Sequence, residues 1–237
     1  MDRGIDVNLR SAPQMLEYIS IVERISGDAP RSILDWGCGL GQVSHMLGRA
    51  GLDVTSFDYR PDAPDAVQAL PHFPEVRAYL SSDPRALPYP DGSFEAVLSC
   101  GVLEHVVDPG ASLDEIARVL VPGGTLYVYK LPNRLSYLEW VARMLGMYYH
   151  GAETYDRVYT ARGARELLER HGYGVRELRL ANMLPLTLDM PIAQRPRAAR
   201  AIWSANRALA AAPGLSQLAT NVEAVAVRPT AAGAQRP

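Results

Sequence analysis

The chain has 237 residues, of which 48% are hydrophobic and 21% charged, with a formal net charge of −2 at pH 7. It is long enough for one large domain with a full core, and its charge provides no overall field that would attract nucleic acid or anionic lipid. No apolar run is long enough to span a membrane, and two cysteines, Cys38 and Cys100, are too few for a disulfide framework or a zinc site. We therefore expect a protein of the reducing cytoplasm with no integral membrane segment and no nucleic-acid partner.

The first predicted element is a helix that starts after Ser11 and stops at Gly27. Serine is a preferred helix cap, and Pro13 suits the first turn. The apolar residues of this stretch recur at helical spacing, at Met15, Leu16, Ile19, Val22 and Ile25. We expect the helix to cover one edge of a sheet, with Tyr18 able to face inward.

Residues 31–42, RSILDWGCGLGQ, are the most informative stretch of the chain. The short apolar run at 32–34 predicts a buried parallel strand, which ends in Asp35. Gly37, Gly39 and Gly41 follow on alternate positions, and apolar residues then recur at helical spacing. A strand, a glycine turn and a helix are therefore predicted in succession.

Such a turn presents the free N–H groups of a helix start, and a partial positive charge, to an anionic group of a ligand. The dinucleotide fingerprint requires a small residue where Gln42 stands, and the Gly-Lys-Ser/Thr of a phosphate-binding loop is missing. The pattern has no place for a pyrophosphate and suits a smaller zwitterion. A tight turn without any ligand is the alternative interpretation.

A second strand is predicted at 52–57, and Asp58 ends it, 23 residues after Asp35. At about this offset, an acid on the next strand reaches the ribose hydroxyls of a bound nucleoside. A carboxylate accepts hydrogen bonds from both hydroxyls, and Tyr59 would then lie beside the base. A solvated acid at a strand end is the alternative.

The chain then alternates between predicted strands and helices: a loop with one helical turn at 61–74, a strand at 76–80 followed by Asp83, a strand at 96–99 followed by Cys100 and Gly101, a helix at 111–120, and a strand at 125–130. This alternation indicates βαβ units and a parallel sheet covered on both faces. Ligands bind beyond the carboxyl ends of such strands. Because Asp35, Asp58, Asp83 and Cys100 all fall at strand ends, they are expected at one edge of the sheet.

Over about residues 30–130, the sequence resembles the class I S-adenosylmethionine-dependent methyltransferases. The resemblance rests on Asp35, Gly37, Gly39, Gly41, Asp58, Asp83 and the runs LPYPDGSFEAV (87–97), LEHV (103–106) and LVPGG (120–124). Within this class, the likeness is to the branch containing the ubiquinone-biosynthesis O-methyltransferases and related small-molecule methyltransferases.

The resemblance implies an α/β fold: a doubly wound, Rossmann-like sheet of seven mostly parallel strands, with helices on both faces and an antiparallel last strand. The later elements are predicted as helices at 160–171 and 202–211, a loop at 185–200, and strands at 173–180 and 222–227. We expect a single domain over residues 1–237, with a substrate-cover insertion at 131–160 and a disordered tail at 229–237.

The resemblance also implies S-adenosyl-L-methionine as the cofactor. The loop from Asp35 to Gly41, including Gly37, Cys38 and Gly39, would hold the amino acid end of the cofactor. Asp58 would hold the ribose, and Cys100 and Gly101 would line the floor of the cofactor site. Tyr59 would border the adenine, and Asp83 would contact the adenine amino group. Some ubiquinone-type members have a metal-binding pattern with a second Glu three residues before the Glu-His pair. Gly101 stands at that position here, so no metal is expected.

A methyl group on a positively charged sulfur is already a strong electrophile, so the enzyme mainly has to align a nucleophile and exclude water. His105, which follows the fourth predicted strand, and His150, in the segment after the fifth, are the candidate catalytic residues. His45 is expected at the surface. The segment 132–159 is apolar over much of its predicted helix, which indicates either core packing or a cover for an apolar, aromatic or lipid-like substrate; contact with a membrane surface is a weaker option because the segment has little positive charge.

The sequence thus predicts methyl transfer to a small, fairly apolar acceptor, with oxygen ahead of nitrogen or carbon as the acceptor atom. A nicotinamide-dependent oxidoreductase and a non-catalytic S-adenosylmethionine-binding module are the competing interpretations.

Overall fold

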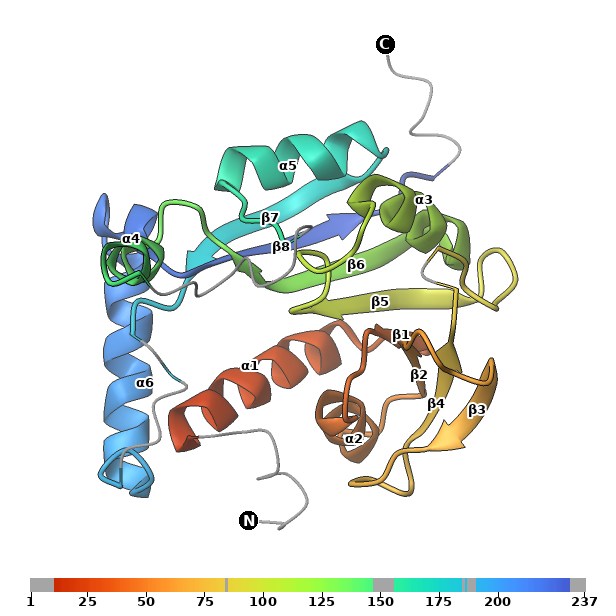
Figure 1. Cartoon of the computed structure of the whole chain (residues 1–237), viewed down its shortest axis with the longest axis horizontal. Helices are drawn as coiled ribbons and strands as arrows, with labels where there is room; N and C mark the ends of the chain where they lie inside the picture. Colours follow the sequence, from red (N-terminus) through yellow and green to blue (C-terminus); the bar gives the residue numbers. More distant parts are fainter. Residues whose placement is uncertain (1–10, 84, 147–155, 185, 187–190, 231–237) are drawn as a thin grey trace.

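A computed structural model describes residues 11–83, 85–146, 156–184, 186 and 191–230 (Figure 1). Its helices are α1 (Ala12–Asp28), α2 (Gln42–Arg49), α3 (Pro109–Val119), α4 (Tyr137–Met144), α5 (Ala161–Arg170), α6 (Pro196–Ala211) and the short 3₁₀ helix η2 (Leu215–Leu218). Its strands are β1 (Ile33–Trp36), β2 (Val54–Tyr59), β3 (Ala66–Ala69), β4 (Arg77–Ser81), β5 (Phe94–Cys100), β6 (Leu120–Pro132), β7 (Gly174–Ala181) and β8 (Asn221–Val227).

The strands form one sheet in the order β3-β4-β2-β1-β5-β6-β8-β7. The five strands from β4 to β6 are parallel, while β8 runs antiparallel to both β6 and β7. The predicted α/β fold class is confirmed. The described sheet has eight strands rather than seven because 66–69, predicted as a helical turn, pairs antiparallel with β4 as an edge strand.

Helices cover both faces of the sheet, with α1 and α2 on one side and α3 and α5 on the other (Figure 1). Strand residues alternate between these two layers, as the period of a strand requires. Leu34 and Val97 face the core under α3 and α5, whereas Ile33 and Leu98 pack with α1 and α2. This two-sided burial explains why adjacent residues of β1 and β5, Ile33 with Leu34 and Val97 with Leu98, are both apolar.

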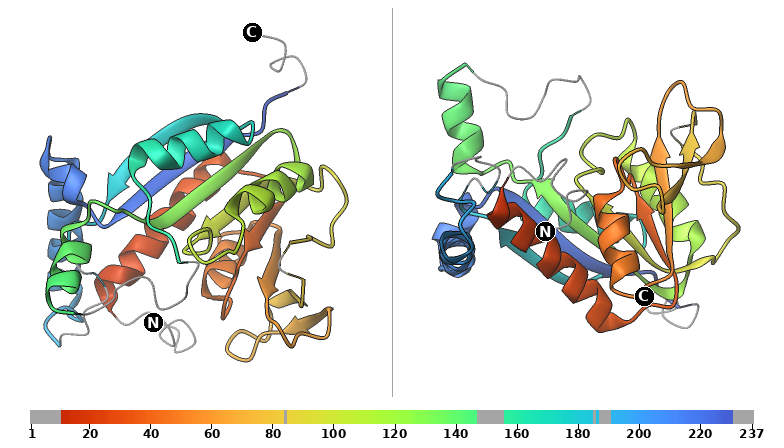
Figure 2. Two further views of the ribbon diagram at one scale, coloured as in Figure 1. Left: turned by 45° about the horizontal axis from the view of Figure 1, so that its top comes forward. Right: turned by 90° about the horizontal axis from the view of Figure 1, so that it is seen from below.

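Helix α6 begins at Pro196, earlier than the predicted 202, because proline is well suited to the first turn of a helix. It packs at the end of α1, as both views of Figure 2 show. No helix in the described part of the chain has the length and apolar character needed to cross a bilayer. Most of the predicted tail at 229–237, and residues 147–155 of the predicted cover, lie outside the described residues.

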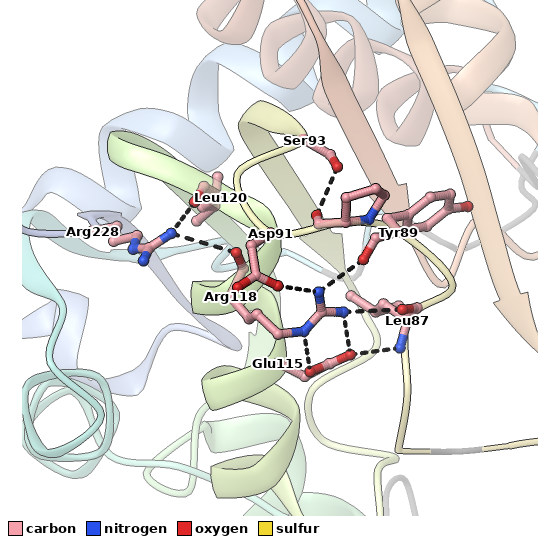
Figure 3. Close-up of polar contacts among 9 residues, drawn as sticks. Leu87, Tyr89, Asp91, Ser93, Glu115, Arg118, Leu120 and Arg228 are labelled. Atoms are coloured by element: carbon pink, nitrogen blue, oxygen red, sulfur yellow. Dashed lines mark hydrogen bonds and ion pairs between the residues drawn. The ribbon is translucent and has the colours of Figure 1, made fainter.

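Arg118 on α3 fixes the loop that leads into β5 (Figure 3). Its guanidinium donates to the carbonyl oxygens of Leu87 and Tyr89 at 3.0 and 2.8 Å, and it pairs with the carboxylates of Glu115 and Asp91 at 2.6 and 2.8 Å. A rigid planar fork of donors suits such a set of fixed acceptors. Residues 87–93, which are part of the LPYPDGSFEAV run described above, are thus held to α3 by the side chain of Arg118.

Candidate functional site

The glycine turn between β1 and α2 is left-handed at all three glycines. Gly37, Gly39 and Gly41 have φ of 77°, 58° and 91°, a region that disfavours any side chain. The amide groups of Gly37 and Cys38 both donate to the carbonyl oxygen of Phe57, at 2.8 and 2.9 Å, which ties the turn to β2.

Asp35, one of the predicted cofactor-binding residues, lies beneath this turn. Its carboxylate accepts a 2.6 Å hydrogen bond from the hydroxyl of Ser44, which in turn accepts one from Ser56 at 2.8 Å. Burial raises the pKa of Asp35 to about 6, against the opposing effect of the bond from Ser44. Asp35 therefore supports the turn and the start of α2 from within the core.

The turn leaves room for a ligand at its middle glycine. A Cβ placed on Gly37 would lie 2.4 Å from Val102, and one on Gly41 would lie 2.5 Å from Leu70, whereas nothing lies within 4 Å of one on Gly39. The side-chain oxygen of Gln42, at the start of α2, is buried and has no hydrogen-bond partner among the described residues. Open space at Gly39, in a turn that leads into a helix start, fits the amino acid end of a nucleoside-linked zwitterion.

Asp58 lies at the end of β2, on the strand next to β1. Burial raises the pKa of its carboxyl group, while the neighbouring Arg60 lowers it. Arg60 spans the gap to the turn: its Nε lies 3.4 Å from the Asp58 carboxylate, and its guanidinium donates to the carbonyl oxygen of Gly39 at 3.3 Å. The aromatic side chain of Tyr59 is 44% exposed at the same place.

The remaining predicted cofactor residues end neighbouring strands. Asp83 follows β4 and is exposed, and its carboxylate accepts a hydrogen bond from the backbone amide of Arg85 at 2.8 Å, as in a local turn. Cys100 ends β5, which pairs with β1, and Gly101 follows with φ of 72°. Both Cys38 and Cys100 are free thiols, and burial raises the pKa of each.

The candidate catalytic residue His105 lies on the loop after β5 and is bound to a distant segment. Its Nδ1 lies 2.9 Å from the carboxylate of Asp156, and its Nε2 lies 3.7 Å from that of Glu104. The other candidate, His150, lies outside the described residues. The prediction that His45 lies at the surface was wrong. Its ring is buried against Phe73, because α2 packs onto the loop between β3 and β4.

Sequence reasoning missed a second polar cluster at this edge. Lys130, near the end of β6, contacts Glu17 at 3.4 Å and the hydroxyl of Tyr18 at 3.3 Å, both on α1. Its ammonium also lies 4.7 Å from the centre of the Tyr18 ring. Only the inward orientation of Tyr18 was foreseen, because no local motif links residues more than a hundred positions apart.

A cavity of about 840 Å³ lies away from the glycine turn, between α1, β7 and α6. Glu17, Arg179 and Trp203 are among its lining residues, whereas none of the predicted cofactor residues lines it. Within the described ranges, no group of three His, Cys, Asp or Glu side chains is arranged to hold a metal ion.

Part of the chain matches a known family model. Residues 34–128 match the family model described as "Methyltransferase domain". This stretch of the chain is similar to that family. It begins one residue before Asp35 and ends inside β6, so it includes the glycine turn, Asp58, Asp83 and the loop after β5.

The chain is also similar to curated proteins of the predicted branch. The chain is 33% identical over 142 residues to a ubiquinone biosynthesis O-methyltransferase of Xylella fastidiosa (strain M23). The match covers 56% of this chain and 56% of that relative, so the chain spans little more than half the length of the relatives it matches.

Solved structures share the fold across most of the chain. A SAM-dependent methyltransferase from Archaeoglobus fulgidus superposes with a TM-score of 0.60 at 16% identity, covering 94% of this chain and 97% of that one. The 1,6-didemethyltoxoflavin-N1-methyltransferase of Burkholderia thailandensis, solved with bound 1,6-didemethyltoxoflavin and S-adenosylhomocysteine, has a TM-score of 0.54 at 16% identity, covering 91% of this chain and 78% of that one. At such identities the likeness shows the fold.

Proposed function

We propose that this protein transfers a methyl group from S-adenosyl-L-methionine to a small, fairly apolar acceptor, with a hydroxyl oxygen as the acceptor atom. The observation that carries the proposal is the left-handed glycine turn with open space at Gly39, next to a partly buried carboxylate, Asp58, on the adjacent strand. The named relatives are O-methyltransferases, which favours oxygen over nitrogen or carbon.

In this proposal, each predicted residue has one task toward the cofactor. The turn from Gly37 to Gly41 holds the amino acid end, with Asp35 and Cys38 as part of its frame. Asp58 accepts hydrogen bonds from the ribose hydroxyls, because a carboxylate has enough lone pairs for both. Tyr59 borders the adenine, Asp83 accepts from its amino group, and Cys100 with Gly101 forms the floor.

When bound, S-adenosylmethionine supplies a methyl group on a positively charged sulfur, an electrophile that needs no further activation. The protein then has to orient the acceptor, keep out water and receive a proton. His105 is held by Asp156 at the edge where the acceptor would enter, which suits an orienting role. His150 and the segment 131–160, a proposed cover for the acceptor, stay sequence predictions.

Methyl transfer is tested with methyl-labelled S-adenosylmethionine and separate panels of phenols, quinols and amines. Label in the phenols or quinols supports the proposal, while label in the amines alone would change the acceptor atom to nitrogen. Binding of S-adenosylhomocysteine without turnover on any panel would indicate a non-catalytic binding module. Binding of a nicotinamide cofactor in its place would overturn the assignment.

A further inference from the structure

The cavity between α1, β7 and α6 has the size of a small-molecule site, and the proposed function does not use it. Its volume of about 840 Å³ falls within the range of about 300–1,000 Å³ that ligand pockets occupy. Helix α6 lies across the end of α1 and contacts β7, so elements far apart in the sequence form its walls (Figure 1). Because no predicted cofactor residue lines the cavity, a ligand bound here would lie apart from the proposed cofactor.

The walls of this cavity are fixed by buried hydrogen bonds. The side-chain oxygen of Asn206, which is 1% exposed on α6, accepts from the backbone amides of Met183 and Leu184 at 2.7 and 2.9 Å. The side-chain nitrogen of Asn206 donates to Asn182 at 2.9 Å, and Asn182 donates in turn to the carboxylate of Glu17 on α1. These lining groups bind one another, so the cavity exists before a ligand enters and its selectivity depends on other residues.

Most of the charged side chains that line the cavity are paired as well. Glu17 contacts Lys130 at 3.4 Å, and Nε of Arg179 on β7 donates to Glu223 at 2.7 Å. Arg24 on α1 has two acidic partners, each at 2.6 Å. Since each of these charges is already compensated within the protein, together they provide little net attraction for a charged ligand.

Two charged lining residues have no ion-pair partner in the described part of the chain: Arg207 on α6 and Glu23 on α1, both exposed. The surroundings favour the arginine as the contact for a ligand, because residues 191–222 contain four arginines and no aspartate or glutamate. The wall formed by α1 carries charges of both signs, whereas the wall formed by α6 is positive throughout. A positive wall attracts an anion, so charge complementarity predicts a negatively charged ligand.

Trp203 adds a planar apolar surface to the same wall. It lines the cavity four residues before Arg207, and side chains at this spacing are neighbours on a helix. An indole packs on other aromatic rings in offset-stacked or edge-to-face arrangements, and a guanidinium binds a carboxylate or phosphate through two parallel hydrogen bonds. The two side chains together therefore suit a ligand that carries both an aromatic ring and an acidic group.

We propose that this cavity is a second ligand site and that it binds a small aromatic anion. The guanidinium of Arg207 donates to the acidic group, and the ring of the ligand packs against Trp203 on the same helix. A cation held by Glu23 is the competing occupant, and the two differ in the charge of the ligand and in the residue that binds it. The inference does not depend on the proposed methyl transfer, because it uses no cofactor residue.

The test is a calorimetric titration of the full chain with 2-naphthoate, an aromatic carboxylate, and with its neutral counterpart 2-naphthylmethanol. The wild-type protein should bind 2-naphthoate about tenfold more tightly than the alcohol, which is the scale of a charge-assisted hydrogen bond. Arg207→Gln should remove this tenfold preference and leave the affinity for the alcohol unchanged. Trp203→Leu should weaken both probes by about two- to tenfold, because it removes the surface on which the ring packs.

Matched controls come from residues outside the cavity. Arg200→Gln, two turns before Arg207 on the same helix, and Trp140→Leu, on α4 and 64% exposed, should leave both affinities unchanged. Saturation with S-adenosylhomocysteine should also leave them unchanged, since the cavity and the proposed cofactor site share no residue. Unaltered urea denaturation of Arg207→Gln and Trp203→Leu shows that the variants are folded.

Three results would overturn the inference. The first is an affinity of the wild-type protein for 2-naphthoate that is undetectable in the millimolar range, or that Arg207→Gln does not reduce. The second is displacement of 2-naphthoate by S-adenosylhomocysteine, which would place the probe at the cofactor site. The third is binding of 2-naphthylmethylammonium in place of 2-naphthoate, with loss of that binding in Glu23→Gln, which would assign the cavity to a cation.

Discussion

The two sides of the candidate site are built in different ways. The proposed cofactor side is built mainly from β1, the glycine turn and β2, within residues 33–59, and later strand ends add Asp83, Cys100 and Gly101. The polar groups on the other side come from across the chain: Tyr18 of α1 contacts Lys130 of β6, and His105 after β5 lies near Glu104 and Asp156. The first depends on backbone conformation and the second on side chains. Substitutions in the glycine turn should therefore mainly change the free energy of unfolding. Substitutions on the other side should mainly change the local charge.

The largest effect is expected from Gly37→Ala on the cofactor side. The new Cβ would lie 2.4 Å from Val102 at a residue with φ of 77°. Left-handed strain and overpacking together should lower the free energy of unfolding by about 3 kcal/mol. Gly48→Ala, inside α2 with nothing within 4 Å, should instead raise it by about 0.5–1 kcal/mol. Equal values for the two variants in urea denaturation would contradict the role given to the turn.

The next effect concerns Arg118, which belongs to neither side. Arg118→Met removes the bonds to Leu87, Tyr89, Asp91 and Glu115 and should lower the free energy of unfolding by about 2 kcal/mol. Arg162→Met, which breaks only an exposed ion pair, should cost about 0–0.5 kcal/mol. Affinity for S-adenosylhomocysteine should remain unchanged in both folded proteins. A matching loss of affinity in Arg118→Met would show that the 87–93 loop contributes to binding.

A pH dependence should identify the contribution of Glu104, in the loop after β5, to the free energy of unfolding. Burial raises the pKa of Glu104 from 4.5 to about 7, so the native protein binds a proton there that the unfolded chain releases. Its contribution to stability is present at low pH and is lost as the pH rises through this window. Glu104→Gln should therefore gain stability relative to the wild-type protein, by about 2 kcal/mol, between pH 4.5 and pH 7. A constant difference across this range, like that expected for Glu166→Gln, would contradict the raised pKa.

The smallest effect is expected from Arg60, which bridges Asp58 and the carbonyl oxygen of Gly39. This contact occupies an oxygen of Asp58 that the ribose would use. Arg60→Ala should therefore tighten S-adenosylhomocysteine binding by about two- to fivefold, the scale of a partly exposed ion pair. Calorimetric titration at low and high salt measures this change. Weaker binding would instead mean that Arg60 contacts the ligand directly.

The same contrast explains what the sequence could predict. The strand, the glycine turn and Asp58 follow one another within residues 33–59, so local pattern was enough to predict them. Edge strand β3 was missed because its short segment gains its structure only by pairing with β4. The direction of Lys130 depends on a bulge against β8, almost a hundred residues later, and the burial of His45 depends on the β3–β4 loop. Neither leaves a local signal.

Binding of S-adenosylhomocysteine to the wild-type protein, Asp58→Asn and Asp62→Asn tests the central claim most directly. Asp58 is proposed to accept two ribose hydroxyls, whereas Asp62 is an exposed acid nearby. Calorimetry should show tight binding to the wild-type protein and Asp62→Asn, and binding weaker by about 10- to 100-fold for Asp58→Asn. Undiminished affinity in Asp58→Asn would contradict a nucleoside cofactor held between Gly39 and Asp58.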